Sequence, residues 1–248
     1  MAYTLHTLLT KVNYTPLTNK KNEWIVIHYT GNLNDKSKSN ANYFYSVNRN
    51  ASAHYFVDEH DVYQVVKDSD KAWHVGRNYG TNNLFGKCTN TNSIGIEMCS
   101  TNGEIADATF DNTVALTKEL MKKYNIPEDH VVTHWMTCSK RCPGWNGWIP
   151  PNDSIWKAFK NDISSSSTGQ SQPVKPQPIP AATSDKSFKV RVKVSTLNIR
   201  KSPSTSATVV GQIKDKGVYT ITETSGNWGK LKSGVGWISI ASAYVIRE

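Results

Sequence analysis

The chain has 248 residues and a formal net charge of +9, with 38% hydrophobic and 10% aromatic residues. This apolar content is enough for a packed core and excludes a wholly disordered chain. No apolar run approaches the ~18 residues that a membrane-spanning helix needs, so we expect no membrane insertion. The length indicates one large domain or two smaller ones.

The N-terminal segment 1–17 lacks the continuous apolar stretch of a secretory signal peptide, because His6, Lys11 and Asn13 interrupt it. We therefore expect the chain to be made in the cytoplasm and to stay there unless something releases it. In that compartment structural disulfides are disfavoured, and cysteines bind metal or are buried. The chain has four cysteines: Cys88, Cys99, Cys138 and Cys142.

The first region alternates strand and helix signals. Strands are predicted at 24–30, in a hairpin over 53–66 that turns near 58–61, at 93–99 and at 131–134. Helices are predicted at 39–48, 109–124 and 152–163. Strands interleaved with helices predict an α/β domain with a mixed sheet flanked by helices.

The helix predicted at 109–124 has the clearest pattern. Thr109 is its expected N-cap, and Lys122 and Lys123 suit its C-terminal end. The residues recurring at helical spacing are Phe110, Val114, Thr117, Met121 and Tyr124, with Leu120 beside them.

Residues 164–187 read SSSSTGQSQPVKPQPIPAATSDKS, a composition that cannot bury enough surface to offset ordering entropy. The prediction is a Ser/Pro-rich linker between a domain at 1–163 and a domain at 188–248. The second domain consists of short strand-like runs separated by turn residues, which predicts a small all-β barrel. It also holds nearly all the excess positive charge, which favours a polyanionic partner: nucleic acid, anionic lipid or anionic wall polymer. A basic surface that only aids solubility is the alternative.

One segment of the first domain carries candidate metal ligands. His134, Cys138 and Cys142 follow one another at four-residue intervals, and all three can bind zinc. The alternative is a core histidine with two buried thiols. His28 lies in an otherwise apolar strand, where a histidine is more often a core residue than a ligand, and spacing alone does not connect it to His134.

Five ordered motifs give the first domain a resemblance to a known family. They are IVIHYTG (25–31), SAHYFVDEHDVYQVV (52–66), AWHVG (72–76), NSIGIEMC (92–99) and THW…SKRCPGW (133–145). Over about the first 160 residues the chain resembles the zinc-dependent N-acetylmuramoyl-L-alanine amidases, whose fold is shared with peptidoglycan recognition proteins.

The resemblance implies roles for particular residues. It assigns one catalytic zinc ion to His28, His134 and Cys142, which precedes a proline as the family's third ligand does. It makes Glu97 the catalytic acid/base and Lys140 a second catalytic residue. Three protein ligands would leave the fourth zinc position open, as in catalytic sites.

The resemblance also leaves some positions without a firm role. Cys138 has no family role and is expected to be structural. Some relatives have a catalytic tyrosine where this chain has Ala53, which favours Glu97 as the acid/base. His54 and His74 are secondary candidates, either for contacting substrate or for supporting the site. From the residues alone, Glu97 and Lys140 would be read as a paired strand residue and a solvated loop charge.

The second domain resembles a bacterial SH3-like domain that binds the cell wall. The residues that carry this resemblance are at 194–221, with its LNIR-x-x-P pattern, and at 228–245. Trp228, Trp237 and Tyr244 are candidates for wall binding, with a core position favoured for both tryptophans because so small a barrel needs large apolar side chains.

Together the two resemblances predict a peptidoglycan hydrolase that cuts the bond between N-acetylmuramic acid and L-alanine. A wall-binding domain without a signal peptide suggests a phage endolysin that acts on a Gram-positive wall after release, with peptidoglycan and anionic wall polymers as partners. The alternative is a non-catalytic peptidoglycan receptor on the same fold. A nucleic-acid-binding function is disfavoured, because no aromatic RNA-binding motif is recognised.

Overall fold

The computed structural model describes residues 3–81, 84–164, 187–203, 207–225, 228–240 and 244–248. The chain divides into two compact units, Met1–Ser164 and Ser165–Glu248, and each is considered by itself. The predicted linker at 164–187 lies outside the described residues except for its two end positions.

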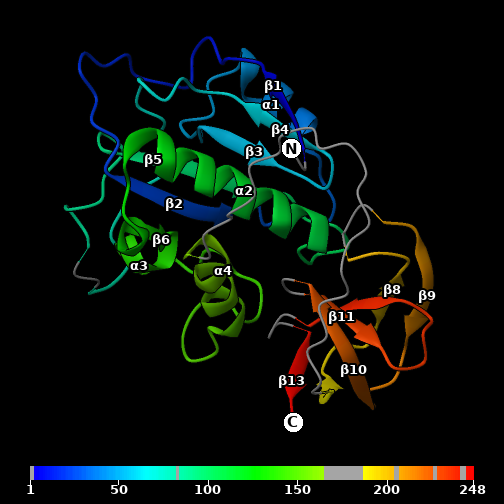
Figure 1. The fold of residues 1–248 in the computed structure, drawn as a ribbon. Helices are drawn as coiled ribbons and strands as arrows, with labels where there is room; N and C mark the ends of the chain where they lie inside the picture. Colours follow the sequence, from blue (N-terminus) through cyan, green and yellow to red (C-terminus); the bar gives the residue numbers. More distant parts are fainter. Residues whose placement is uncertain (1–2, 82–83, 165–186, 204–206, 226–227, 241–243) are drawn as a thin grey trace. The chain divides into compact units, whose positions relative to one another are not determined.

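A six-stranded mixed sheet forms the centre of the first unit, in the order β1-β4-β3-β5-β2-β6 (Figure 1). Strands β3, β5, β2 and β6 are parallel neighbours, while β4 is antiparallel to β3 and β1 is parallel to β4. The strands are β1 (Thr4–Thr7), β2 (Trp24–Tyr29), β3 (Tyr55–Val57), β4 (Asp61–Gln64), β5 (Ser93–Met98) and β6 (Val131–Thr133). The helices are α1 (Ser37–Tyr45), α2 (Asp107–Tyr124), the short η1 (Glu128–His130), α3 (His134–Cys138) and α4 (Ser154–Ser164). The mixed α/β architecture predicted from the sequence is confirmed, although β1 and α3 were not predicted.

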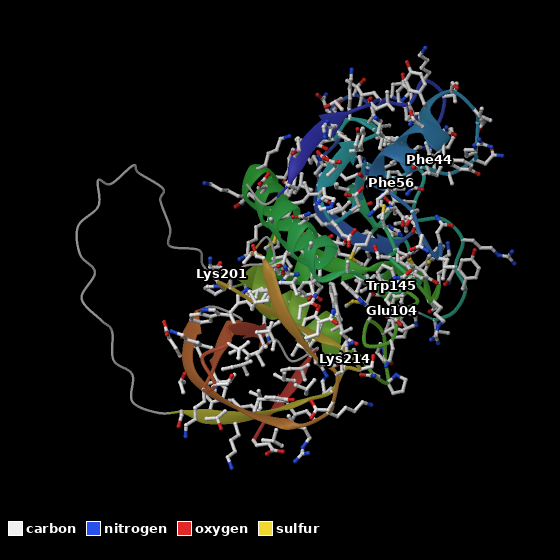
Figure 2. The ribbon with its side chains drawn as sticks, turned by 90° about the vertical axis from the view of Figure 1, so that its right-hand side faces the viewer. Phe44, Phe56, Glu104, Trp145, Lys201 and Lys214 are labelled. Carbon is white, nitrogen blue, oxygen red and sulfur yellow. The ribbon has the colours of Figure 1, made fainter. Side chains whose placement is uncertain are left out.

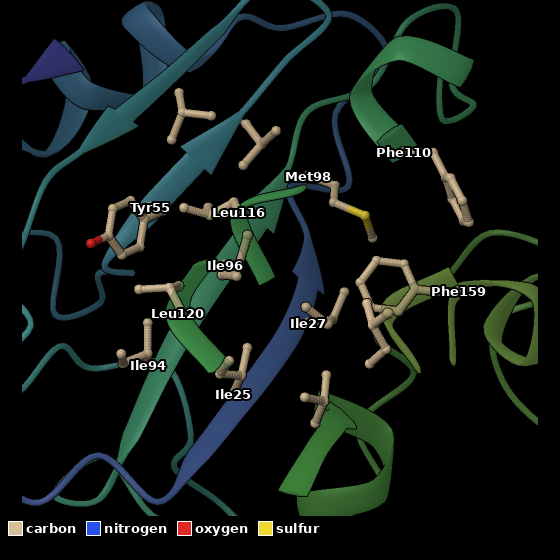
Figure 3. Close-up of a cluster of buried hydrophobic side chains, with 14 of the residues drawn as sticks. Ile25, Ile27, Tyr55, Ile94, Ile96, Met98, Phe110, Leu116, Leu120 and Phe159 are labelled. Atoms are coloured by element: carbon tan, nitrogen blue, oxygen red, sulfur yellow. The ribbon is translucent and has the colours of Figure 1, made fainter. Parts of the chain in front are cut away.

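Alternation along the strands separates the two faces of the sheet, because successive strand side chains point to opposite sides. On one face, Ile25 and Ile27 of β2 and Ile94, Ile96 and Met98 of β5 form a core with side chains of α2 and α4 (Figure 3). These strand residues are fully buried. One face of the central strands is therefore used entirely for packing.

The opposite face carries the polar residues considered below. Val26 packs there with Val75 and Val132. Further along the sheet, Phe56 of β3 stacks on Phe44 of α1, with ring centroids 5.3 Å apart (Figure 2). His28 is two residues after Val26 and therefore points to this face, away from α2.

The helix α2 corrects two predictions. It begins at Asp107, and Ala106 occupies the N-cap without a side-chain hydrogen bond, so the prediction of Thr109 as the N-cap was wrong. Thr109 lies inside the first turn, buried, and its carbonyl accepts a hydrogen bond from the Thr113 hydroxyl. Lys122 and Lys123 do lie in the last turn, as predicted. The buried face is centred differently from the predicted one, since Val114, Met121 and Tyr124 only flank a buried set: Thr109, Phe110, Asn112, Thr113, Leu116, Thr117 and Leu120.

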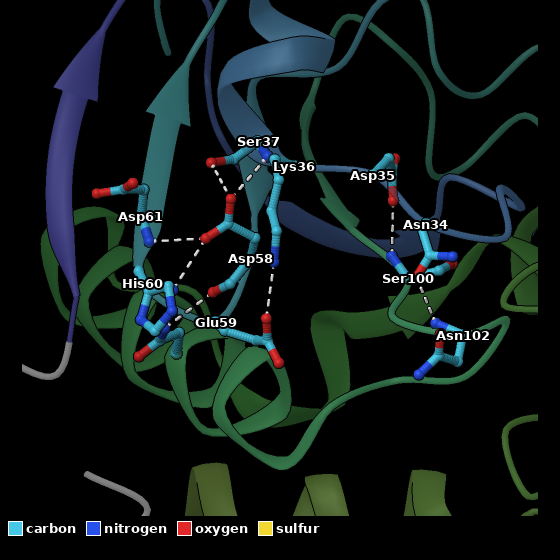
Figure 4. Close-up of polar contacts among 11 residues, drawn as sticks. Asn34, Asp35, Lys36, Ser37, Asp58, Glu59, His60, Asp61, Ser100 and Asn102 are labelled. Carbon is cyan, nitrogen blue, oxygen red and sulfur yellow. Dashed lines mark hydrogen bonds and ion pairs between the residues drawn. The ribbon is translucent and has the colours of Figure 1, made fainter.

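Two carboxylates organise the loops around the start of α1 (Figure 4). Asp58 accepts hydrogen bonds from the backbone and hydroxyl of Ser37 and from the backbone amides of His60 and Asp61. Burial opposes ionisation of Asp58, but these hydrogen bonds outweigh it and hold its pKa below the usual value. Asp35 accepts from the backbone amide of Ser100 at 2.7 Å, which ties the loop after β2 to the loop after β5.

A third carboxylate, Asp68, connects the sheet to α2. Its oxygens accept hydrogen bonds from the hydroxyls of Tyr55 and Tyr124 at 2.6 Å and from Lys123 Nζ at 2.9 Å. Gln64 adds a fourth, at 3.1 Å. Asp68 is buried, and burial opposes its ionisation, but the hydrogen bonds from Tyr124, Tyr55 and Lys123 outweigh burial and lower its pKa.

Replacing Asp68 with alanine is expected to destabilise the first unit by about 3 kcal/mol, because the buried Tyr55 hydroxyl loses its acceptor. Calorimetry should place its unfolding transition at lower temperature while the second unit's transition stays unchanged. Asp129→Ala, at an exposed position, is the matched control. Folding lowers the pKa of Asp68. Its contribution to the free energy of unfolding is therefore fully present above the pKa that Asp68 has in the unfolded chain, and it is lost as the pH falls through the lower pKa of the folded protein. Equal effects of both variants would contradict this role.

The second unit is all β, as predicted. Its seven strands pair antiparallel in the order β13-β7-β10-β11-β12-β8-β9. They are β7 (Phe188–Val192), β8 (Leu197–Arg200), β9 (Val209–Ile213), β10 (Val218–Ser225), β11 (Trp228–Leu231), β12 (Trp237–Ser239) and β13 (Val245–Arg247), the last not predicted. The core consists of Val190, Val192, Leu197, Ile199, Ile213, Ile221, Leu231, Ile238 and Val245.

No helix within the described residues combines the length and apolar character required to cross a bilayer.

Candidate metal centre and active site

Parallel strand register brings the candidate residues together at one edge of the sheet. His28 on β2 is paired with Glu97 on β5, so both side chains point to the same face near the carboxyl ends of their strands. On the other side of β2, Ile27 is paired with Thr133, the last residue of β6. His134 follows Thr133 directly and thus lies beside His28, with ring centroids 4.5 Å apart.

Cys142 reaches the same place through a loop. The short helix α3 starts at His134, where the Thr133 side chain accepts from the Met136 amide at the N-terminus, and it ends as Ser139 adopts a left-handed conformation. The chain then turns back, and the Trp135 amide donates to the Cys142 carbonyl at 2.9 Å. The four-residue spacing from His134 to Cys142 therefore does not place the three side chains on one helical face, because α3 ends at Cys138.

A close backbone approach fixes the loop just after Cys142. A Cβ atom added to Gly144 would lie 2.1 Å from the Tyr29 hydroxyl, so only glycine fits over this ring. Tyr29 also packs edge-on against Trp145, with centroids 5.1 Å apart. Tyr29, which follows His28 at the end of β2, thus supports the loop that presents Cys142.

The three candidate ligands form a compact buried set. One ligand atom each from His28, His134 and Cys142 can be chosen so that all lie within 4.8 Å of one another. Cys142 Sγ is 3.7 Å from His28 Nδ1. Neither ring nitrogen of the buried His134 has a hydrogen-bond partner among the described residues. Unpaired buried polar atoms are costly, and two imidazoles with a thiol are a zinc donor set, so these residues fit a metal ion.

The protonation states also suit metal binding. Burial, reinforced by the positive charge of Lys140, lowers the pKa of His134 to about 3. Burial likewise lowers the pKa of His28 well below its ordinary value, with smaller contributions from the neighbouring histidines and Lys140. Both imidazoles are therefore neutral at physiological pH and can donate a lone pair. Burial raises the pKa of the Cys142 thiol, so a metal ion must displace its proton.

Glu97 lies beside this set and is partly buried, with its carboxyl oxygen Oε2 shielded from solvent. Its Oε2 has no hydrogen-bond partner among the described residues. Burial raises its pKa to about 8, with an opposing effect from Lys140 and a smaller raising effect from Asp35. Lys140 itself is exposed in the loop between α3 and Cys142, and its charge influences the pKa values of His28, His134, Glu97 and Cys142. A carboxyl with a pKa near neutrality can both accept and return a proton.

The two secondary histidines are placed differently from the ligands. His54 is fully buried and His74 is 8% exposed, which argues against direct substrate contact and favours the supporting role. His74 Nδ1 lies 3.0 Å from His28 Nε2. His54 Nδ1 accepts from the Gly95 amide, and its Nε2 is 2.9 Å from Lys20 Nζ. No sequence motif pointed to Ser93, whose hydroxyl forms a hydrogen bond of 3.2 Å with His74 Nε2.

The remaining cysteines and the aromatic candidates of the second unit lie outside the candidate ligand set. Cys88, Cys99 and Cys138 are free and buried, and Cys138 lies in α3 with its thiol near the His134 carbonyl. In the second unit Trp237 is 9% exposed, in keeping with the core position favoured for it, and Tyr244 is partly buried against the core. Trp228 is also partly buried. Their role in wall binding stays a prediction.

The buried His28, His134 and Cys142 set next to Glu97 is a candidate metal site on an α/β domain. The family model described as N-acetylmuramoyl-L-alanine amidase matches residues 18–145, and a bacterial SH3 domain model matches residues 195–246. The amidase CwlH of Bacillus subtilis (strain 168) is 31% identical over 182 residues, covering 72% of this chain and 68% of CwlH. The chain belongs to the N-acetylmuramoyl-L-alanine amidase family.

Other similar proteins extend this comparison. A probable N-acetylmuramoyl-L-alanine amidase of Bacillus licheniformis is 31% identical over 147 residues, which cover 57% of this chain but only 41% of that relative. Among solved structures, a mutant endolysin from Bacillus subtilis matches 65% of this chain and 99% of its own, at 26% identity and a TM-score of 0.53. The PlyG catalytic domain matches 68% and 99%, at 26% identity and a TM-score of 0.54.

Proposed function

We propose that this protein is a zinc-dependent peptidoglycan hydrolase that cleaves the amide bond between N-acetylmuramic acid and L-alanine. The observation that carries the proposal is the convergence of His28, His134 and Cys142 within 4.8 Å, with both nitrogens of His134 lacking a partner among the described residues. Family membership supports the same reaction, and Glu97 beside the ligands supports catalysis over binding alone.

Each candidate residue has a separate role in the proposed reaction. His28, His134 and Cys142 would hold one zinc ion, which supplies Lewis-acid chemistry by polarising a carbonyl oxygen and acidifying water. Glu97 takes the proton of the attacking water and returns it to the leaving amine. Lys140, exposed at the edge of the site, places positive charge where an oxyanion develops.

The second unit would hold the enzyme on its substrate. It matches a bacterial SH3 domain and carries a large share of the chain's positive charge. We propose that it binds the cell wall, where anionic polymers attract a basic surface. We further propose that the protein acts as a phage endolysin on a Gram-positive wall after release from the cytoplasm; its similarity to the solved structure of an endolysin from Bacillus subtilis supports this.

Product analysis tests the proposed reaction. Purified Gram-positive wall incubated with the protein should gain free L-alanine amino groups without gaining reducing sugar ends. If neither amino groups nor reducing ends are released, the protein is a peptidoglycan receptor. If new reducing ends appear, it is a glycosidase. Either result would contradict the proposal.

Deleting residues 186–248 is expected to weaken attachment to intact wall by about 10²-fold, because binding through the second unit raises the local concentration of the first. Cleavage of short soluble muropeptides should be nearly unchanged. A Lys201→Ala, Lys214→Ala double variant, which alters two exposed lysines of the second unit (Figure 2), should show a smaller loss that high salt removes. Equal losses on wall and on soluble fragments would contradict this division of labour, and so would salt-sensitive DNA binding without wall binding.

A further inference from the structure

The two ring nitrogens of His28 face different partners. Nδ1 points toward the Cys142 thiol, 3.7 Å away, while Nε2 lies 3.0 Å from Nδ1 of His74. Both rings are buried, with exposed fractions of 1% and 8%. A neutral imidazole carries one proton, so its position decides which nitrogen is free to bind a metal ion.

A hydrogen-bond chain behind His28 fixes that proton. The Ser93 hydroxyl donates to the Thr89 carbonyl, which can only accept. With its single proton used there, the Ser93 oxygen accepts from Nε2–H of His74. His74 then has its lone pair on Nδ1 and accepts from Nε2–H of His28. The lone pair of His28 is thereby left on Nδ1, facing Cys142.

Neighbouring residues hold His74 in this hydrogen-bond chain. The side-chain oxygen of Asn90 accepts the backbone amides of His74 and Val75 at 2.9 and 2.6 Å. A Cβ atom added to Gly95 of β5 would lie 2.7 Å from the His74 ring, so the imidazole occupies the space that glycine leaves. Ser93, two residues before Gly95, is fully buried.

We infer that His74 and Ser93 are positioning residues that lock His28 in the tautomer with its proton on Nε2, so that only Nδ1 is available to zinc. The inference rests on the metal-binding part of the proposed function. A ligating imidazole whose other N–H is held by an acceptor is oriented and made more basic, and loss of such a partner typically weakens metal binding.

Zinc affinity, measured by competition with a chromophoric chelator, gives the first test. His74→Ala should weaken zinc binding by about 10- to 100-fold, and Ser93→Ala should weaken it less. His74→Asn should recover most of the loss, because its Oδ1 can take the place of Nδ1 as the acceptor. Gly95→Ala should resemble His74→Ala, since it displaces the ring without removing a polar group. His130→Gln is the matched control, because His130 lies outside the hydrogen-bond chain of Ser93, His74 and His28. It should bind zinc with the affinity of the parent protein.

Long-range proton–nitrogen NMR correlations give a second readout that does not depend on stability. In the zinc-loaded protein His28 should carry its proton on Nε2 and bind zinc through Nδ1. Zinc binding through Nε2, or affinities of His74→Ala and Ser93→Ala within twofold of the parent protein, would overturn the inference while leaving the proposed function intact. A parent protein that binds no zinc would overturn both.

Discussion

Replacing Glu97 with glutamine is expected to lower turnover on peptidoglycan by about 10²- to 10⁴-fold, the usual loss when a general acid/base is removed. Glutamine has nearly the same shape and can hydrogen-bond, but it cannot accept the proton of the attacking water. Because Glu97 is not one of the three candidate ligands, zinc content should stay at the parent level. Turnover should be measured as release of amino groups from purified wall, with metal content determined on the same samples.

A matched control separates this effect from a general change of charge. Glu104 is exposed on the loop after β5, and Glu104→Gln should retain parent activity (Figure 2). Glu97→Ala should be as inactive as Glu97→Gln. Lysis at the parent rate by both Glu97 variants would show that the acid/base is another group. Loss of zinc from Glu97→Gln would instead place the carboxylate among the ligands.

The central strands were predictable because their apolar residues leave a clear local signal. The run at 24–30 became β2 at Trp24–Tyr29, and the run at 93–99 became β5 at Ser93–Met98. The edge strands β1 and β13 have only four and three residues, mostly exposed, so no apolar pattern marked them. Short edge strands are defined by the neighbour they pair with, which a single sequence does not reveal.

Predictions for α2 failed where tertiary packing overrode local preference. Threonine is a favoured N-cap, but the helix starts two residues before Thr109, which is buried. The helical spacing on which the prediction of Val114 and Met121 rested describes equally well a buried face shifted by one residue along the sequence. The sheet buries Leu116 and Leu120 more completely, and periodicity alone could not decide between these faces.

The candidate site is a product of strand register, which explains what the sequence could not supply. His28 and Glu97 are 69 positions apart, and pairing of β2 with β5 places them side by side. His134 joins them only because β6 adds to the other side of β2. Without the family resemblance, His28 would have been interpreted as a core histidine and not as a metal ligand. The hydrogen bond between His28 and His74 was likewise not predictable, because no characteristic sequence spacing marks a contact between two buried rings on distant segments.

Removing the metal is expected to abolish activity, because no other candidate residue acidifies water and the charge of Lys140 alone does not replace the metal at the carbonyl oxygen. Protein treated with a strong chelator and desalted should release no amino groups from wall, and one equivalent of zinc should restore the parent rate. Cys142→Ser should bind zinc poorly and remain inactive after zinc is added. Cys99→Ser, which changes a buried cysteine outside the ligand set, should bind zinc normally.

The pH dependence of zinc binding tests the same site without a substrate. The imidazoles of His28 and His134 are already neutral near pH 7, because burial lowers their pKa values. Burial raises the pKa of the Cys142 thiol, so one proton leaves for each zinc ion bound. Apparent affinity should therefore fall about tenfold for each unit that the pH decreases near neutrality, and calorimetry in buffers of different ionisation enthalpy should count one proton. Affinity independent of pH, or full lysis in persistent chelator, would exclude a catalytic metal held by this thiolate.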